Sequence, residues 1–382
     1  MSEYDNELER IVAELNRAAA PIAQPGAEWL PTTSSVDQML AYAVQRGASD
    51  LLIIAGAPVT LRVNGVITPS GPPLSAEDSR NLLMPLLTKK QTEQFQQTKA
   101  LDFCFTRESL GRFRANIHHQ RETIAGSIRL LPNQIPSLES LHLPPVLARL
   151  AERRQGLILV TGPTGCGKSS TLAALIDFIN TAHKYHIVTI EDPVEFVHSN
   201  RLSIVEQMEV GSDVPDFASS VRSILRWNPD VILVGEMRDA ETMATVLTAA
   251  ETGHLVLSTL HTNDTSQTVS RILDSFPAGS QPQIRQQLSL ALLGIVAQQL
   301  LPGTDGKRYP VLEVLIATPA VRTLIRRGED HQLYSRISTA RAEGMITMEQ
   351  SLADMVRIQR ISRDVAFAHC FRPEDLRGYL EP

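Results

Sequence analysis

The chain has 382 residues, of which 43% are hydrophobic and 20% charged, and this composition argues against a disordered chain or a coiled coil. A formal net charge of −6 without a long basic block argues against nucleic acid as the main partner, because phosphate binding needs concentrated Lys and Arg. The three cysteines form no CxxC pair, so they predict neither a structural zinc nor a disulfide framework.

No segment of the sequence is typical of a membrane span or a signal peptide. The longest apolar stretch, Leu288–Ala297, is about half of the length that a transmembrane helix needs. The first ten residues are acidic and lack an apolar signal core. We therefore expect a cytoplasmic protein of two or three domains.

Residues 1–34 are interpreted as an N-terminal extension. Within it, residues 3–20 have the periodicity of an amphipathic helix, which the prolines from Pro21 onward end. The apolar face of this predicted helix consists of Leu8, Ile11, Val12 and Leu15. The helix either packs on its own domain or docks a partner.

Residues 35–132 are expected to form a small α+β domain. The segment SVDQMLAYAVQRG predicts a helix capped by Ser35 or Asp37, and SAEDSRNLLMPLL predicts a second helix with a capping-box spacing. DLLIIAG and VTLRVNGVITP predict strands, the latter folded into a hairpin at Asn64–Gly65. Further alternating strands follow up to Pro132.

The proline-rich residues 133–147 are expected to be a linker, and residues 148–382 a second domain. Four short apolar runs alternate with helical segments, among them 216–227 and 239–252, which predicts a mostly parallel sheet with helices on both faces. Residues 281–299 and 318–382 are predicted to be helical. The expected fold class is therefore α/β.

A phosphate-binding P-loop follows the first run of the second domain. The pattern GxxxxGK[ST] is complete, with a predicted strand before it and a helix after it. Backbone amides would converge on ATP phosphates, Lys168 would reach the β- and γ-phosphates, and the Ser169 hydroxyl would ligate Mg²⁺. Cys166 occupies a position that needs only backbone and is not expected to act as a nucleophile. The predicted nucleotide-binding residues are Gly162, Pro163, Thr164, Gly165, Cys166, Gly167, Lys168, Ser169 and Ser170.

Acidic residues follow two of the other predicted strands. Glu191 could orient or deprotonate the attacking water, and Asp192 could hold the metal shell or a neighbouring loop. Either residue could instead be a helix-cap or turn carboxylate. Glu236 follows four apolar residues and a glycine, which fits the carboxylate that acts on Mg²⁺ and water. The pattern does not divide these two roles between Glu191 and Glu236. Arg238 and Asp239 could form a local ion pair.

Histidines flank the last predicted strand of this series. His261 comes at its end, where it could sense the γ-phosphate, link the site to a neighbouring subunit, or be structural. His254 precedes the strand and is expected to be structural.

Four segments together resemble, in order, the motifs of the secretion-type motor ATPases. GPTGCGKSSTLAALIDFIN resembles their Walker A region, IVTIEDPVEFVH their aspartate box, RWNPDVILVGEMRDAETM their Walker B region and TAAETGHLVLSTLHTND their histidine box. Within that family the chain is most similar to the type IV pilus retraction ATPases, the PilT-type twitching-motility motors. RGASDLLIIAGAPVTLRVNG resembles their N-terminal domain, and AVRTLIRRGEDHQL with GMITMEQSLADMV resembles their C-terminal helical region.

The resemblance implies a PAS-like N-terminal domain followed by a RecA-like ATPase domain with C-terminal helices, assembled into a homohexamer. Arg112, Arg114 and Arg129 match arginines that reach the phosphates from the neighbouring subunit, although each could instead form a structural ion pair. ATP hydrolysis would turn an inner-membrane pilus platform protein, on the cytoplasmic face of that membrane, and retract the pilus. The alternatives are a pilus-assembly or type II secretion motor, and an ATP-binding regulatory paralogue that acts with the main motor ATPase.

Overall fold

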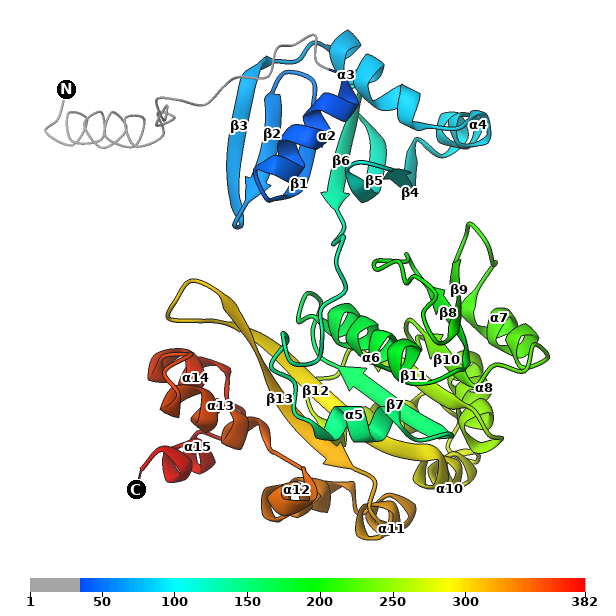
Figure 1. Ribbon diagram of the computed structural model, residues 1–382, viewed down its shortest axis with the longest axis vertical. Coiled ribbons are helices and arrows are strands. Elements are labelled where there is room, and N and C mark those ends of the chain that lie inside the picture. Colours follow the sequence, from blue (N-terminus) through cyan, green and yellow to red (C-terminus); the bar gives the residue numbers. More distant parts are fainter. Residues whose placement is uncertain (1–34, 382) are drawn as a thin grey trace, which may run out of the picture. The chain divides into compact units, whose positions relative to one another are not determined.

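The computed structural model describes residues 35–381, so the helix expected over residues 3–20 lies outside the described part of the chain. The chain divides into two compact units, the first ending at Leu130 and the second beginning at Leu131 (Figure 1). None of the helices between residues 35 and 381 combines the length and the apolar character of a bilayer span.

The first unit is a six-stranded antiparallel sheet with the strand order β3-β2-β1-β6-β5-β4. Alternate residues of these strands, such as Leu51, Leu61 and Phe113, join buried residues of the helices in one hydrophobic core. The strands are β1 (Ala48–Ile53), β2 (Pro58–Val63), β3 (Val66–Pro73), β4 (Ala100–Arg107), β5 (Gly111–Gln120) and β6 (Thr123–Leu130). The helices are α2 (Val36–Gln45), α3 (Ala76–Leu83) and α4 (Lys89–Thr98), with a 3₁₀ turn at Met84–Leu86.

Local sequence signals account for most of this unit. Ser35 caps α2, and Ser75 and Asp78 make both hydrogen bonds of the predicted capping box at α3. Asn64 and Gly65 both have positive φ in the predicted hairpin turn between β2 and β3. Helix α4 is not predicted by the sequence, because only Phe95 of its ten residues is buried and the helix therefore shows no apolar periodicity.

The second unit contains a seven-stranded sheet with the strand order β13-β12-β7-β11-β10-β8-β9. Every neighbouring pair is parallel except β12 and β13, which form an antiparallel pair at one edge. The strands are β7 (Gly156–Thr161), β8 (His186–Glu191), β9 (Ile204–Glu209), β10 (Val231–Val234), β11 (Leu255–Leu260), β12 (Leu292–Pro302) and β13 (Arg308–Ile316). The predicted α/β fold class is confirmed, with an antiparallel edge strand added.

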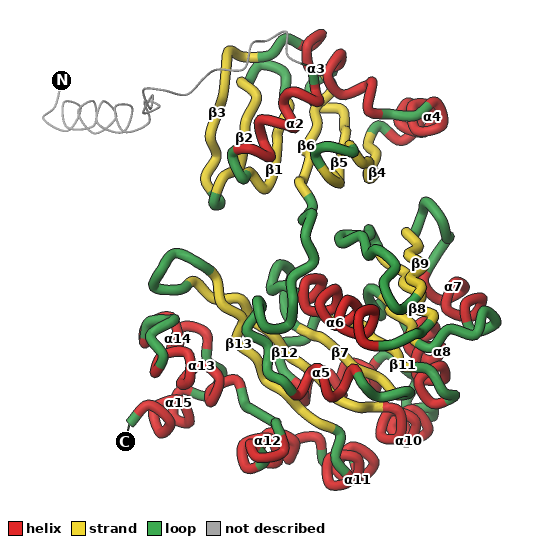
Figure 2. The backbone as a smooth tube through the Cα atoms, in the orientation of Figure 1, coloured by secondary structure: helices red, strands yellow, loops and turns green. Residues whose placement is uncertain are grey.

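Helices cover both faces of this sheet (Figure 2). Leu157 and Leu159 of β7 belong to the core on one face, whereas Ile158 and Val160 belong to the core on the other. The helices are α5 (Val146–Ala151), α6 (Lys168–Ala182), α7 (Phe217–Ile224), α8 (Ala240–Glu251), α9 (Thr265–Asp274), α10 (Gln281–Ala291), α11 (Pro319–Arg327), α12 (Leu333–Thr339), α13 (Met348–Arg357), α14 (Arg363–His369) and α15 (Pro373–Leu380). The last three pack on the β12–β13 pair in a smaller cluster.

The helix predicted over residues 281–299 is wrong in its second half. Helix α10 ends at Ala291, and strand β12 begins at Leu292. Strand β12 is buried on both faces, so its sequence is a continuous apolar run without the alternation that marks a half-exposed strand. The region 318–382 is largely helical as predicted, although short turns divide it into five α-helices within the described residues.

Candidate nucleotide-binding site

The P-loop leaves the end of β7, all six residues of which are buried. Gly162 has a φ of +141°, and Gly165 and Gly167 also have positive φ. A Cβ atom on Gly162 would lie 2.2 Å from the carbonyl oxygen of Gln298. Only glycine fits this position, both for its backbone conformation and for the space available.

Lys168 is the first residue of α6, and its side chain turns back over the loop. Its Nζ donates hydrogen bonds to the carbonyl oxygens of Gly162 at 2.7 Å and Pro163 at 3.1 Å. Burial lowers the pKa of Lys168, and the negative charges of Glu236 and Glu195 oppose this shift. These hydrogen bonds place the Lys168 ammonium group against the P-loop backbone. A phosphate bound in the loop would replace the two carbonyl oxygens as the partner of this ammonium group.

The remaining loop residues divide into exposed and buried positions. Pro163, Thr164 and Gly165 are exposed, and Ser169 and Ser170 are half-buried in the first turn of α6. Cys166 is buried, and burial raises the pKa of its thiol. A protonated, enclosed thiol is a poor nucleophile, which agrees with the interpretation that this position needs only backbone.

Gln298 on β12 supports the P-loop through its side-chain amide, and the sequence did not predict this role. Its side chain is 3% exposed. Its Nε2 donates to the Cys166 carbonyl at 2.6 Å, and its Oε1 accepts from the Thr171 hydroxyl at 2.8 Å. A single amide thus connects the loop to the first turns of α6. The available signal was a polar residue inside an apolar run, but that run was assigned to a helix.

The carboxyl ends of β8, β10 and β11 lie at the same edge of the sheet as the P-loop, because these strands run parallel to β7. Glu236 follows β10 and His261 follows β11, and His261 Nε2 lies 3.2 Å from Glu236 Oε2. Arg238 forms an ion pair with Glu236 and lies 3.9 Å from Asp192. The structure therefore brings two of the predicted catalytic side chains into direct contact.

The ion pair considered for Arg238 and Asp239 is wrong. Asp239 caps helix α8 by accepting a hydrogen bond from the Thr242 amide at 2.8 Å, and Arg238 pairs with Glu236 instead. A carboxylate that precedes a helix satisfies the first-turn amides, which leaves the preceding arginine free to turn toward the sheet edge.

Glu191 is the last residue of β8 and has different partners. Its Oε1 accepts hydrogen bonds from the Thr189 hydroxyl at 2.7 Å and from Gln207 Nε2 at 3.2 Å. Burial raises the pKa of Glu191, and these two hydrogen bonds act in the opposite direction. A half-buried carboxylate with a raised pKa at the end of a sheet strand has the character of a general base.

The three predicted arginines belong to the sheet of the first unit. Arg114 on β5 and Arg129 on β6 are cross-strand partners, and both are exposed. Arg129 Nε donates to Asp50 Oδ1 at 2.9 Å, and the other oxygen of Asp50 lies 3.5 Å from Arg62. Arg129 therefore has the ion pair that was considered as its structural alternative. Arg112, two residues before Arg114 on the same strand, is half-buried.

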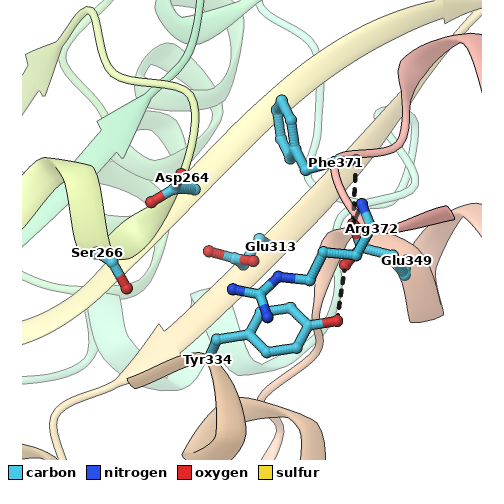
Figure 3. Close-up of a pocket in the computed structure, with 7 residues that line it drawn as sticks. All are labelled: Asp264, Ser266, Glu313, Tyr334, Glu349, Phe371 and Arg372. Carbon is cyan, nitrogen blue, oxygen red and sulfur yellow. Dashed lines mark hydrogen bonds between the residues drawn. The ribbon is translucent and has the colours of Figure 1, made fainter. Parts of the chain in front are cut away.

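Two further features of the second unit lie outside the loop. Nδ1 of His254 lies 3.0 Å from the Ala249 carbonyl at the end of α8, which fits its expected structural role. A small cavity of about 80 Å³ lies among α9, β13 and the C-terminal helices (Figure 3). The cavity is lined by Asp264, Ser266, Glu313, Tyr334, Glu349, Phe371 and Arg372.

The side chains around this cavity connect the C-terminal helices with α9. Glu313 is 3% exposed and accepts two hydrogen bonds from Thr265, the first residue of α9, and burial raises its pKa. Glu349 accepts hydrogen bonds from the backbone amides of Phe371 and Arg372. The guanidinium group of Arg372 lies 3.5 Å from the centre of the Tyr334 ring. These contacts pack the C-terminal helices against α9 and β13 of the seven-stranded sheet unit.

Known proteins are similar to this chain over most of its length. The family described as type II/IV secretion system protein matches residues 127–308. The type IV pilus retraction ATPase PilT of Pseudomonas aeruginosa is 40% identical over 89% of this chain and 99% of its own length. The type IV pilus ATPase PilU of the same organism is also 40% identical, over 89% of this chain and 90% of its own length. A crystal structure of the pilus retraction motor PilT with bound ADP has a TM-score of 0.85 and 43% identity, covering 90% of this chain and 99% of that one.

Proposed function

This chain belongs to the family of type II/IV secretion system proteins that contains the type IV pilus ATPases, and we propose on this basis that it is an ATP-hydrolysing motor for pilus retraction. The observation that carries the proposal is the formed P-loop at the sheet edge where Glu191, Glu236 and His261 also lie. The similarity to PilT spans almost the whole length of that protein, so it includes both units.

In this proposal the residues of the sheet edge have separate roles. The loop amides and Lys168 hold the phosphates at the positive end of α6. Glu191 takes a proton from the attacking water, because its raised pKa makes it a stronger base than an ordinary carboxylate. His261, in contact with Glu236, reports the state of the γ-phosphate.

The donor set of the site fits Mg²⁺. Ser169 and Glu236 offer a hydroxyl and a carboxylate, the oxygen ligands that Mg²⁺ prefers, and Mg²⁺ commonly binds through few protein ligands plus substrate phosphates. Arg238 and His261 would have to release Glu236 before it served the ion. Bound Mg²⁺ would neutralise charge on the phosphates.

We place this activity in a homohexamer at the cytoplasmic face of the inner membrane. Arg112, Arg114 and Arg129 would stabilise phosphoryl-transfer charge on a neighbouring subunit's nucleotide, so that hydrolysis changes the arrangement of subunits. The ring would act on an inner-membrane platform protein of the pilus. The similarity to both PilT and PilU supports a role in the pilus system and keeps a paralogous motor ATPase among the proposed partners.

The decisive experiment replaces Lys168. We expect Lys168→Ala to reduce ATP turnover more than about 100-fold, because the variant loses the ammonium group that lies against the loop carbonyls. Phosphate release by purified protein measures the effect, and Lys184→Ala, at an exposed position after α6, is the matched control. A Lys168→Ala protein that turns over ATP at the wild-type rate would refute the assignment.

Cell-based measurements separate retraction from its alternatives. A deletion strain with excess surface pili and lost twitching motility supports retraction, whereas loss of surface pili supports an assembly or secretion motor. A regulatory paralogue, the other alternative, would bind ATP but show negligible turnover as a purified ring.

A further inference from the structure

Gln207 lies on β9, next to the strand that carries Glu191. Strands β8 and β9 are parallel, and their register pairs Thr189 with Gln207 and Glu191 with Glu209. Because side chains alternate along a strand, Thr189, Glu191 and Gln207 point to the same face of the sheet. The proximity of Gln207 to Glu191 therefore follows from the strand register.

Three hydrogen bonds fix the Gln207 amide. Its Nε2 donates to Glu191 Oε1 at 3.2 Å and to the Phe196 carbonyl at 2.8 Å, and its Oε1 accepts from the His198 amide at 2.7 Å. If the amide nitrogen and oxygen were exchanged, the amide nitrogen of Gln207 would face the N–H of His198, so two donors would meet. The amide oxygen of Gln207 would face the Glu191 carboxylate and the Phe196 carbonyl, so two acceptors would meet at each contact. The orientation of the amide is therefore determined by its surroundings.

We propose that Gln207 is the positioning residue for Glu191. The Gln207 amide connects the Glu191 carboxylate with the backbone of the segment that follows the Asp192–Pro193 pair. This inference rests on the proposed role of Glu191 in activating water. Thr189 and Gln207 both donate to Oε1, so together they fix the plane of the carboxylate and the direction in which Oε2 is presented. A base that is held in one orientation loses less freedom in the transition state.

Gln207 also joins Glu191 to the backbone segment that contains Phe196 and His198. Residues 196 and 198 are bound by the same amide that holds the carboxylate, so a shift of this segment changes the environment of Glu191 directly. Hydrogen bonds from Thr189 and Gln207 favour the charged form of Glu191, against the burial that raises its pKa. Loss of the Gln207 donor would therefore raise that pKa further.

The test is the pH dependence of ATP hydrolysis. In Gln207→Leu, a near-isosteric change, we expect the acid limb of the kcat/KM profile to move up by about one pH unit, the shift that corresponds to one hydrogen bond to a charged group. The plateau rate is also expected to fall. Gln207→Glu keeps the acceptor for the His198 amide but places a second carboxylate beside Glu191, so it should move the limb in the same direction and serves if Gln207→Leu does not fold.

Asn180→Leu is the matched control. Asn180 is fully buried and holds the same segment through the Ser199 carbonyl at 2.8 Å and the Arg201 amide at 3.2 Å, and it lies on α6 rather than on β9. If Gln207→Leu acted only by loosening the segment around residues 196–201, Asn180→Leu would shift the acid limb of the kcat/KM profile by the same amount. That result, or an unmoved limb in both Gln207 variants, would overturn the inference.

A separate variant distinguishes this inference from the proposed function. Glu191→Gln should lose hydrolysis while still binding ATP. If Glu191→Gln turns over ATP at the wild-type rate, the assignment of Glu191 as the base fails, and the positioning role fails with it. If Glu191→Gln is inactive and the Gln207 variants show the wild-type pH profile, only the role of Gln207 is refuted.

Discussion

Replacing Gln298 tests whether the P-loop depends on the strand beneath it. The variant Gln298→Leu removes the donor to the Cys166 carbonyl and the acceptor of the Thr171 hydroxyl. Both partners are buried, so each would be left without its present hydrogen bond. At a net value of about 1 kcal/mol for each bond, plus the cost of leaving buried groups unsatisfied, the free energy of unfolding should fall by about 2–3 kcal/mol.

The same variant should weaken nucleotide binding. If about half of the lost energy is needed to hold the loop in its phosphate-binding conformation, the Kd for ADP rises about tenfold, because 1.4 kcal/mol corresponds to a factor of ten. Titration with a fluorescent nucleotide measures Kd, and urea unfolding measures stability.

Gln299→Leu is the control in the same strand. Gln299 is half-buried, and its Nε2 lies 3.4 Å from the His369 carbonyl, near the C-terminal helices rather than the loop. We expect this variant to leave the Kd for ADP unchanged. Equal Kd values for Gln298→Leu and the wild type would refute the claim that β12 supports the loop.

Three further variants test other parts of the second unit. Burial lowers the pKa of His198 from 6.5 to about 4, so the unfolded protein binds a proton at this residue at a higher pH than the folded protein does. The free energy of unfolding should therefore fall by about 3 kcal/mol as the pH falls from 6.5 to 4. A His198→Gln variant that shows the same fall in urea titrations would contradict this. The Tyr334 hydroxyl lies 2.6 Å from Asp375 and 3.1 Å from Glu349, so Tyr334→Phe should lower stability by about 1–2 kcal/mol in thermal unfolding, and an unchanged Tm would show that water replaces the hydroxyl. Gly162→Ala should abolish ADP binding in calorimetry, because its Cβ would overlap the carbonyl of the facing strand; wild-type binding would mean that the loop relaxes without cost.

The sequence predicts those parts of the site that depend on contiguous residues. The P-loop, the carboxylates at strand ends and the capping box of α3 each need residue types at fixed short spacings. The order of βα units then determines that Glu191, Glu236 and His261 reach the same sheet edge, because parallel strands align their carboxyl ends.

Contacts between distant residues could not be predicted in this way. Gln298 lies 127 positions from Thr171, and its role depends on β12 being inserted beside β7. The apolar sequence of β12 fits a buried helix equally well, because burial on both faces removes the alternation of a strand. Gln207 presents the same difficulty on a smaller scale, since its contact with Glu191 exists only in the register of β8 and β9.

The Asp50 carboxylate has two arginine partners, and this arrangement affects how easily Arg129 can leave it and return. Its side chain is 10% exposed and is shared by Arg129 and Arg62, the latter at 3.5 Å. Because the Arg129 side chain is 64% exposed, solvent screens its attraction to Asp50, whereas a phosphate offers a guanidinium a stronger, bidentate partner. When Arg129 leaves, Arg62 remains as counter-ion, so the carboxylate is never stranded. If Arg129 binds a neighbouring subunit's nucleotide as proposed above, it can leave Asp50 and return to it in each cycle of hydrolysis, because Arg62 remains beside the carboxylate.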